Sequence, residues 1–317
     1  MAPVAHLDRR LVVVTGKGGT GKSTVAAALA LLSARAGRRV LVAEVNAEAR
    51  VAQLLGAPPA GHDVREALPG IFTVNVTPPA ALREYGLQVV RFQAIYDAVF
   101  ENRLVRHFLR VVPGLGELVM LGKILHEARA EVGGRPRWDQ VIIDAPSTGH
   151  AVQLLRVPGA MLGMVPPGPL RSDAQWMQAW LVDPARTTAV LVTLPEEMPV
   201  TEAIELDGRL RQQVGLAPAA VLVNAMPRQR LTEAQAARLG PLTSAPAPVG
   251  PAARSAQLHA VRSAAARREL QRLRAALPLP TALLPLVAAV GWGPDEVEQI
   301  AAALAGREGR SPWLEPA

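Results

Sequence analysis

The sequence feature that most constrains the fold is a glycine-rich octapeptide, GKGGTGKS, at residues 16–23. It matches the pattern G-x-x-x-x-G-K-[ST] at every fixed position. An apolar β-branched run, Arg10 to Thr15, precedes it, and a helical stretch rich in Ala and Leu, Gly21 to Ala36, follows. The glycines let consecutive backbone N–H groups curl around phosphate oxygens, and the helix N-terminus adds a favourable dipole. The octapeptide therefore predicts a phosphate-binding loop rather than a chance glycine turn.

Seven apolar runs of strand length are spread along the chain, and helical stretches separate most of them. The runs are continuous rather than alternating, which is typical of strands buried on both faces of a parallel sheet. Strands that alternate with helices indicate an α/β fold with a doubly wound, mostly parallel sheet. The seven runs are Arg10 to Thr15, Arg39 to Val45, Ile71 to Val76, Gln140 to Ala145, Thr188 to Leu194, Ala219 to Asn224 and Thr281 to Val287.

The 317 residues are interpreted as a single domain, residues 1–317, with an inserted helical subdomain. The insertion is residues 79–134, where the pattern is helical and no strand is predicted. A second helical stretch, residues 149–183, is a candidate addition to this subdomain. Residues 241–251, which are rich in proline and small side chains, predict a loop or a short linker.

The absence of cysteine excludes several classes of site, because the chain has none. Disulfides, cysteine zinc sites, cysteine-ligated iron–sulfur clusters and a cysteine nucleophile are all ruled out, and the cytoplasm is the simplest compartment. The N-terminal residues have no secretory apolar region. The uncharged stretch from Ala275 to Pro294 is about as long as a membrane span. Four prolines interrupt it, so it predicts a loop, a buried strand and a loop, with no transmembrane segment.

The net charge of +7 arises from 34 basic and 27 acidic residues, nearly all of the basic ones arginine. We expect arginines scattered over the surface of an alanine-rich chain, which would give only a weak field, and therefore no specific nucleic-acid partner. One stretch contains a basic helix, for which contact with phosphate is the alternative and a solvated face is favoured. Its arginines are Arg254, Arg262, Arg267, Arg268, Arg272 and Arg274.

The second motif is an apolar strand that ends in an aspartate, Val141 to Asp144, followed by APSTGH. A carboxylate there orients Mg²⁺ or its water shell at the edge of the sheet where ligands collect. The loop KGGTGKS resembles the deviant Walker A motif, KGGxGK[ST], of MinD, ParA, nitrogenase iron protein and the arsenite-pump ATPases. DAPSTGH is similar to the DTAPTGH switch II of the arsenite-pump ATPases and their tail-anchored-protein-targeting relatives. Ala145, Pro146 and Ser147 stand where that family has Thr, Ala and Pro.

The resemblance implies a P-loop ATPase that binds ATP and Mg²⁺ and closes as an ATP-sandwiched dimer, either of identical chains or with a related ATPase. It implies that Lys17 acts in trans on the partner's nucleotide. It also implies that Ser23 and Asp144 serve Mg²⁺. Asn224, at the end of the run VLVN, is expected to contact adenine, with an ordinary turn residue as the alternative. The predicted catalytic residues are Lys17, Lys22, Asn46 and Asp144; the predicted nucleotide contacts are Gly16, Lys17, Gly18, Gly19, Thr20, Gly21, Lys22, Ser23, Thr24 and Asn224.

Two departures from the family pattern limit the function. Asn46 takes the position of the switch I aspartate, and an amide orients water but does not accept its proton, so we expect slow hydrolysis. Glu44 and Glu48 are candidate substitutes, although a strand-end carboxylate and a solvated helix residue are the favoured interpretations. Without cysteine, neither the metalloid site of the arsenite pumps nor the zinc clasp of the eukaryotic targeting ATPases can form.

Three functions remain open on the sequence. The favoured one is an ATP-dependent switch that couples its nucleotide state to a hydrophobic helical client through the helical subdomain. The alternatives are a non-hydrolysing scaffold or heteromeric partner and, less favoured, a positioning ATPase like ParA or MinD. Aromatic and methionine side chains are candidates to line a client groove, although core packing is the more common role of such a stripe. They are Phe92, Tyr96, Phe100, Phe108, Met120, Met161, Met164 and Met177.

Overall fold

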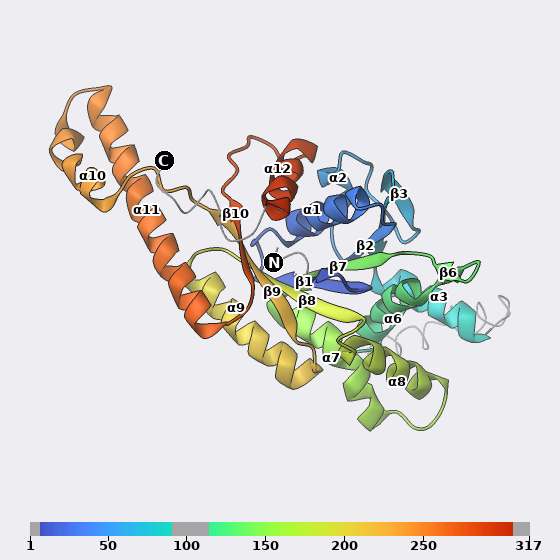
Figure 1. The fold of residues 1–317 in the computed structure, drawn as a ribbon. Helices are drawn as coiled ribbons and strands as arrows, with labels where there is room; N and C mark the ends of the chain where they lie inside the picture. Colours follow the sequence, from blue (N-terminus) through green and yellow to red (C-terminus); the bar gives the residue numbers. More distant parts are fainter. Residues whose placement is uncertain (1–6, 91–113, 307–317) are drawn as a thin grey trace.

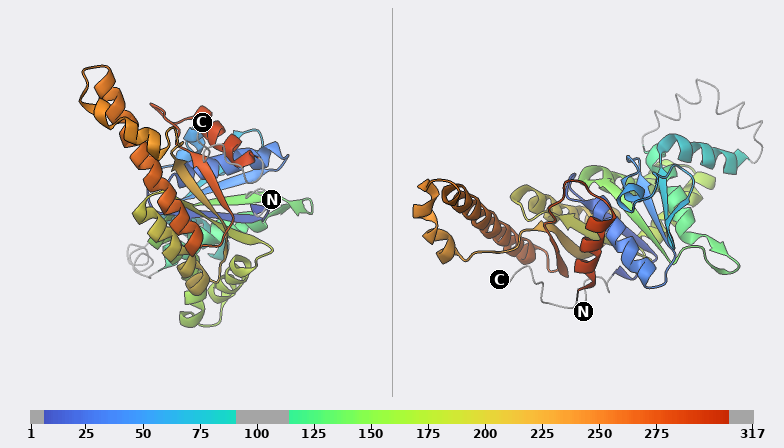
Figure 2. Two further views of the ribbon diagram at one scale, coloured as in Figure 1. Left: turned by 60° about the vertical axis from the view of Figure 1, so that its left-hand side comes forward. Right: turned by 90° about the horizontal axis from the view of Figure 1, so that it is seen from above.

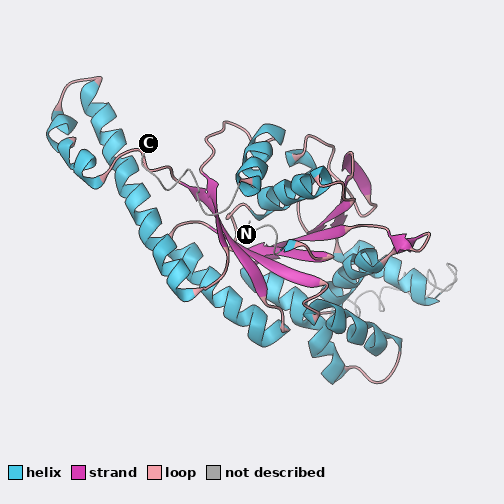
Figure 3. Ribbon diagram, viewed as in Figure 1, coloured by secondary structure: helices cyan, strands magenta, loops and turns pink. Residues whose placement is uncertain are grey.

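The computed structural model describes residues 7–90 and 114–306, and an eight-stranded sheet lies at its centre (Figures 1 and 3). The strand order is β10-β9-β8-β1-β7-β2-β4-β3, and every pair is parallel except β3 with β4. This confirms the predicted α/β fold with a doubly wound, mostly parallel sheet. The strands are β1 (Leu11–Gly16), β2 (Val40–Val45), β3 (Arg65–Leu68), β4 (Ile71–Val76), β7 (Gln140–Ser147), β8 (Thr187–Thr193), β9 (Pro218–Met226) and β10 (Thr281–Pro285).

Helices cover both faces of this sheet (Figure 1). One face packs against α1 (Lys22–Arg35), α2 (Arg50–Leu54) and α12 (Pro294–Ala305). The other face carries the remaining helices of the core. These are α3 (Pro78–Val90), α6 (Leu115–Arg129), α7 (Thr148–Met164), α8 (Pro169–Val182), α9 (Glu197–Arg209) with the π-helical turn η2 (Leu210–Val214), and the C-terminal half of α11 (Val249–Ala276).

The central strand β1 shows why the apolar runs are continuous. Leu11 and Val13 pack into the cluster formed with α6, α7 and α9, whereas Val12 and Val14 pack into the cluster formed with α1 and α12. All four side chains are buried. Because successive strand residues face opposite sides, a strand covered on both faces needs an apolar residue at every position.

All seven predicted strands are present, and the structure adds short ones that the sequence did not indicate. β3 is a four-residue strand at the edge of the sheet. A hairpin of β5 (Glu131–Val132) and β6 (Arg135–Pro136) lies where only helix was predicted, and its turn is formed by two glycines with positive φ. Both were missed because runs of two to four residues are too short to show an apolar pattern.

The segment predicted as a loop, residues 241–251, is largely helical. It contains most of the 3₁₀ turn η3 (Gly240–Ser244) and the first residues of α11, which leaves only residues 245–248 without helix. Its prolines lie at or near helix starts, where the missing N–H has no intrahelical partner to lose. Composition therefore predicted the turn but not the helices on either side of it.

The helical parts of residues 79–134 and 149–183 lie on one face of the sheet, where α3 packs on α6 and α7 packs on α8. The proposed aromatic stripe, Phe92 to Phe108, falls outside the described residues. Met120 and Met161 are buried in the core, so they do not line an open groove. Met177 lines a cavity of about 390 Å³ between α3, α6 and α8, and Met164 is exposed.

The chain's positive charge is concentrated rather than scattered, which corrects the sequence-based expectation. Residues 227–276 contain nine arginines and two glutamates, so this segment alone accounts for the net charge of +7. It comprises α10 (Glu233–Arg238), η3 and α11, and its outer part projects from the body of the molecule (Figure 2). Within the described ranges, every helix is too short or too polar to cross a bilayer.

The packing of α6 on the sheet gives a stability prediction. Leu125 is fully buried on α6, so Leu125→Ala should leave a cavity and lower the free energy of unfolding by about 2–5 kcal/mol. Leu258→Ala on α11 is the control, because Leu258 is 53% exposed and its truncation should change stability by less than about 0.5 kcal/mol. Urea unfolding of both variants measures this. Equal effects would mean that α6 does not contribute to the core as described.

Candidate nucleotide-binding site

The glycine-rich loop joins the end of β1 to α1, and two of its glycines are required by their surroundings. A side chain at Gly16 would collide with the carbonyl oxygen of Val192 in β8. Gly21 has φ +89° and a side chain there would collide with the amide nitrogen of Asn224 in β9. Backbone approaches of this kind are possible only without a Cβ. The loop is therefore held against the neighbouring strands rather than free at the surface.

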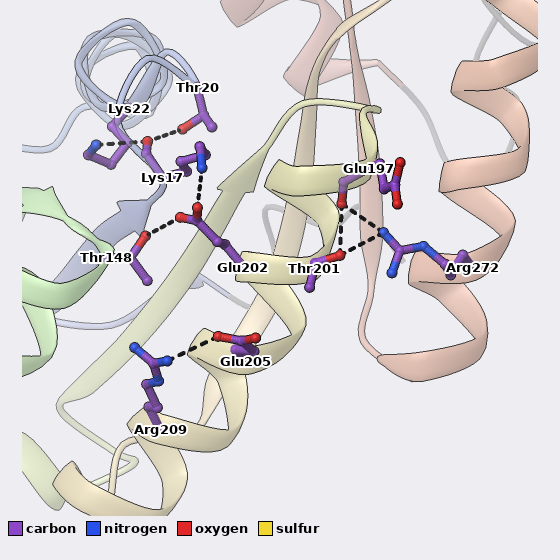
Figure 4. Close-up of polar contacts among 10 residues, drawn as sticks. All are labelled: Lys17, Thr20, Lys22, Thr148, Glu197, Thr201, Glu202, Glu205, Arg209 and Arg272. Carbon is purple, nitrogen blue, oxygen red and sulfur yellow. Dashed lines mark hydrogen bonds and ion pairs between the residues drawn. The ribbon is translucent and has the colours of Figure 1, made fainter.

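The carbonyl oxygen of Lys17 organises the inside of the loop (Figure 4). It accepts hydrogen bonds from Thr20 Oγ1 at 2.9 Å and from Lys22 Nζ at 3.2 Å. Burial lowers the pKa of Lys22, and the nearby carboxylate of Asp144 partly opposes that shift. A lysine that folds back over its own loop is placed to meet an anion bound there.

Ser23 and Asp144 meet at the centre of the site, as the two motifs together imply. Ser23 Oγ donates a hydrogen bond of 2.6 Å to Asp144 Oδ2, while Asp144 Oδ1 is buried without a hydrogen-bond partner among the described residues. Burial raises the pKa of Asp144 to about 6, against the lowering influence of Ser23 and Lys22. This hydroxyl–carboxylate pair offers the hard oxygen ligands that Mg²⁺ prefers.

A second carboxylate, Glu44, stands next to Asp144. The two are register partners on the adjacent parallel strands β2 and β7, and both side chains are buried. Burial raises the pKa of Glu44 to about 7; a hydrogen bond from the Val51 N–H opposes this shift, and repulsion from Asp144 adds to it. Glu44, Asp144, Lys22 and Ser23 together line a cavity of about 270 Å³.

Lys17, the lysine expected to act in trans, is bound within its own chain (Figure 4). Its ammonium group forms an ion pair with Glu202 of α9, and the other oxygen of Glu202 accepts a 3.3 Å hydrogen bond from Thr148 Oγ1. Thr148 is the first residue of α7, directly after the DAPS segment. Glu202 therefore connects the glycine-rich loop to the segment that resembles switch II.

The remaining predicted residues lie around this centre. Asn46 is exposed just after β2, with φ +48°, and its N–H donates to the Val76 carbonyl oxygen at 2.9 Å. Asn224 is buried, and its amide donates to the Thr20 carbonyl oxygen at 2.9 Å. Thr24 is half-buried at the start of α1, whereas Gly18 and Gly19 are exposed. Asn46 is absent from the lining of the cavity formed around Glu44 and Asp144.

Sequence reasoning missed one residue of the site entirely and gave too little weight to another. Glu202 belongs to no motif, because its partners Lys17 and Thr148 are 185 and 54 residues away in the chain. Glu44 was considered but favoured as an ordinary strand-end carboxylate. The signal available for Glu44 was a charged residue within an otherwise apolar strand, which is unusual in a strand buried on both faces.

Comparison with known proteins finds relatives that match the segments forming this site. Residues 9–165, which include the loop, Glu44 and Asp144, match the family model of anion-transporting ATPases. The chain belongs to this family. It is 34% identical over 227 residues to the ATPase BagA of Mycobacterium tuberculosis, covering 68% of this chain and 64% of that relative. The arsenical pump-driving ATPase of Acidiphilium multivorum is 26% identical over 240 residues, covering 70% of this chain and 40% of the pump ATPase. The chain thus spans less than two thirds of the length of either relative.

The buried carboxylate pair gives a pH prediction for the protein without metal or nucleotide. Because the pKa of Asp144 is raised in the folded state, that state binds more protons than the unfolded chain between about pH 4 and 6. The free energy of unfolding should therefore fall as the pH rises through this range. Asp144→Asn should remove the part of that loss that Asp144 causes and stabilise the protein at pH 8 by about 2 kcal/mol, while Glu44, whose pKa is raised to about 7, still lowers the stability as the pH rises to that value.

Urea unfolding in EDTA between pH 4 and 8 measures this effect. Asp63→Asn is the matched control, because Asp63 is exposed and the same substitution there should leave the pH dependence unchanged. A wild-type profile parallel to that of Asp144→Asn would contradict the prediction.

Proposed function

We propose that this chain binds Mg-ATP at the glycine-rich loop and hydrolyses it slowly, as an ATP-driven molecular switch. The observation that carries the proposal is the hydrogen bond between Ser23 and Asp144, beside Lys22 in one cavity. This arrangement places side by side the three side chains that P-loop ATPases use to bind phosphate and Mg²⁺. The match of residues 9–165 to an ATPase family supports the same activity.

The donor set in the cavity fits a magnesium ion. Ser23 offers a hydroxyl, and Asp144 offers a buried carboxylate whose Oδ1 has no hydrogen-bond partner among the described residues. In this proposal Ser23 and Asp144 hold Mg²⁺, which neutralises charge on the β- and γ-phosphates when bound. Lys22 contacts the phosphates. Asn224 holds the loop through its amide N–H group, and its carbonyl oxygen is the candidate acceptor for the adenine amino group.

Slow hydrolysis is expected because the carboxylate of switch I is missing. Asn46 is exposed and neutral, so it can orient water but cannot take its proton. Phosphoryl transfer depends mainly on positioning and charge stabilisation, which the loop, Lys22 and Asp144 retain. Binding without any turnover is the signature of the second candidate, a scaffold or heteromeric partner subunit, and Asn46 is the observation that favours it.

The switch itself is proposed to be an ATP-dependent dimer. Lys17 stands in the loop position from which it would reach a partner's nucleotide, but it is held by Glu202 of its own chain. Closing the dimer would release Lys17 from Glu202, and Glu202 also accepts a hydrogen bond from Thr148 at the start of α7. The change would thus pass to the helical layer of α6, α7 and α8, the proposed contact surface for a helical client.

Phosphate release from Mg-ATP by the purified protein tests the hydrolysis. We expect a slow turnover that Lys22→Ala reduces at least about 100-fold, because it removes the cation that contacts the phosphates. Nucleotide binding measured in parallel separates the candidates. Tight binding with turnover no greater than in Lys22→Ala would reject the hydrolysing switch and leave the scaffold.

The Lys17–Glu202 ion pair predicts how the dimer responds to substitution. Glu202→Gln weakens the hold on Lys17 and should lower the ATP concentration for half-maximal dimerisation about two- to fivefold, as expected for a partly exposed ion pair. Light scattering with a non-hydrolysable ATP analogue measures this. Glu205→Gln on the same helix is the control, because Glu205 pairs only with Arg209 among the described residues (Figure 4). Equal midpoints for both variants would show that Glu202 does not restrain Lys17.

A further inference from the structure

Glu44 occupies an unusual position for a glutamate. It lies within β2 (Val40–Val45), a strand in which every residue is buried, and its own side chain has no exposed surface. Removing a carboxylate from water costs several kcal/mol unless hydrogen bonds or a cation compensate. A glutamate at this position therefore needs a partner that matches its charge.

The contacts of Glu44 account for only one of its two oxygens. Oε1 accepts a hydrogen bond of 3.0 Å from the Val51 N–H in the first turn of α2. Oε2 is buried and has no hydrogen-bond partner among the described residues. Capping of α2 explains the first oxygen, and an amide at this position would provide it equally well. For the second oxygen, no contact within the described residues explains why the side chain is a carboxylate rather than an amide.

The carboxylate of Glu44 lies beside the proposed magnesium site. Glu44 is the direct register partner of Asp144 across β2 and β7, and Asp144 Oδ1 is likewise buried without a hydrogen-bond partner in the described part of the chain. Both residues line the cavity that Lys22 and Ser23 also line. Two neighbouring carboxylates with free oxygens repel each other unless a cation or its water shell lies between them. Mg²⁺ retains several of its waters in proteins, and each of them donates hydrogen bonds.

We propose that Glu44 is a positioning residue of the Mg-ATP site, whose Oε2 accepts a hydrogen bond from a water bound to Mg²⁺. This rests on the proposed binding of Mg-ATP. Glu44 then supplies the carboxylate that switch I lacks, two residues before Asn46. Asn46 is exposed just after the strand, whereas Glu44 is buried within β2 and lines the cavity.

The rival for this role is Glu48, which lines the same cavity. Its side chain is 81% exposed and already pairs with Arg50 at 2.9 Å. An exposed, paired carboxylate is hydrated and carries no unmet hydrogen bond. Burial and the free oxygen therefore favour Glu44.

The test replaces Glu44 by glutamine, which keeps the hydrogen bond to the Val51 N–H and removes the charge. Mn²⁺ replaces Mg²⁺ as a paramagnetic probe, and its affinity for the protein–ADP complex is measured by electron paramagnetic resonance. Outer carboxylates of metal sites typically contribute 10–100-fold in affinity, so Glu44→Gln should weaken Mn²⁺ binding at least about tenfold. Phosphate release, where the wild type shows it, should fall by a comparable factor.

Glu66→Gln is the matched control. Glu66 also accepts a hydrogen bond from a backbone N–H, that of Gly70 at 3.1 Å, but it is exposed on β3. Its substitution should change Mn²⁺ affinity less than twofold. Circular dichroism and urea unfolding establish that each variant is folded.

Mn²⁺ affinity of folded Glu44→Gln equal to that of the wild type would overturn the proposal and leave Glu44 as a helix cap. A loss of affinity in Glu48→Gln but not in Glu44→Gln would overturn it in favour of Glu48. A wild-type protein that binds Mn-ADP but releases no phosphate would contradict the hydrolysing switch alone. In that case the Mn²⁺ measurement still decides the role of Glu44.

Discussion

The hydrogen bond between Ser23 and Asp144 joins residues that are 121 positions apart, and the rest of the site depends on what makes it possible. It requires β1 and β7 to lie side by side and parallel, so that the loop after one strand meets the carboxyl end of the other. The pairing of β2 with β7 then places Glu44 directly beside Asp144. The register of three central strands thus brings a hydroxyl and two carboxylates together, and the glycine-rich loop only has to close over them.

Helix α9 is the element that connects this site to the rest of the molecule (Figure 4). Glu202 contacts Lys17 of the loop and Thr148 of α7. Thr201, the residue before Glu202, accepts a 3.0 Å hydrogen bond at its Oγ1 from Arg272 of α11. The same guanidinium group donates a 2.8 Å hydrogen bond to the Glu197 carbonyl oxygen. Through Glu197, Thr201 and Glu202, α9 therefore contacts the glycine-rich loop, α7 and α11.

The parts of the molecule that could be predicted from sequence are those governed by local pattern. Continuous apolar runs located seven strands, and strand context around the two motifs located Ser23 and Asp144. Glu202 could not be located in this way, because its meeting with Lys17 depends on where α9 packs. Glu44 Oε2 has no hydrogen-bond partner among the described residues, and this too could not be predicted, because it follows from the burial of β2 and not from any motif. The concentration of arginine in residues 227–276 could have been counted from the sequence, whereas the projection of this segment from the body could not.

The length of α11 separates the charges at its outer end from those at the end that packs on α9. Arg254 is eighteen residues from Arg272, so the two are roughly 27 Å apart along α11 at the rise of an α-helix. That is about three times the screening length of physiological salt, which is about 8 Å. Charges near the outer end of α11 are therefore screened from Arg272, which lies where α11 packs on α9. The outer end of α11 and the end that packs on α9 can therefore change their charge independently of each other.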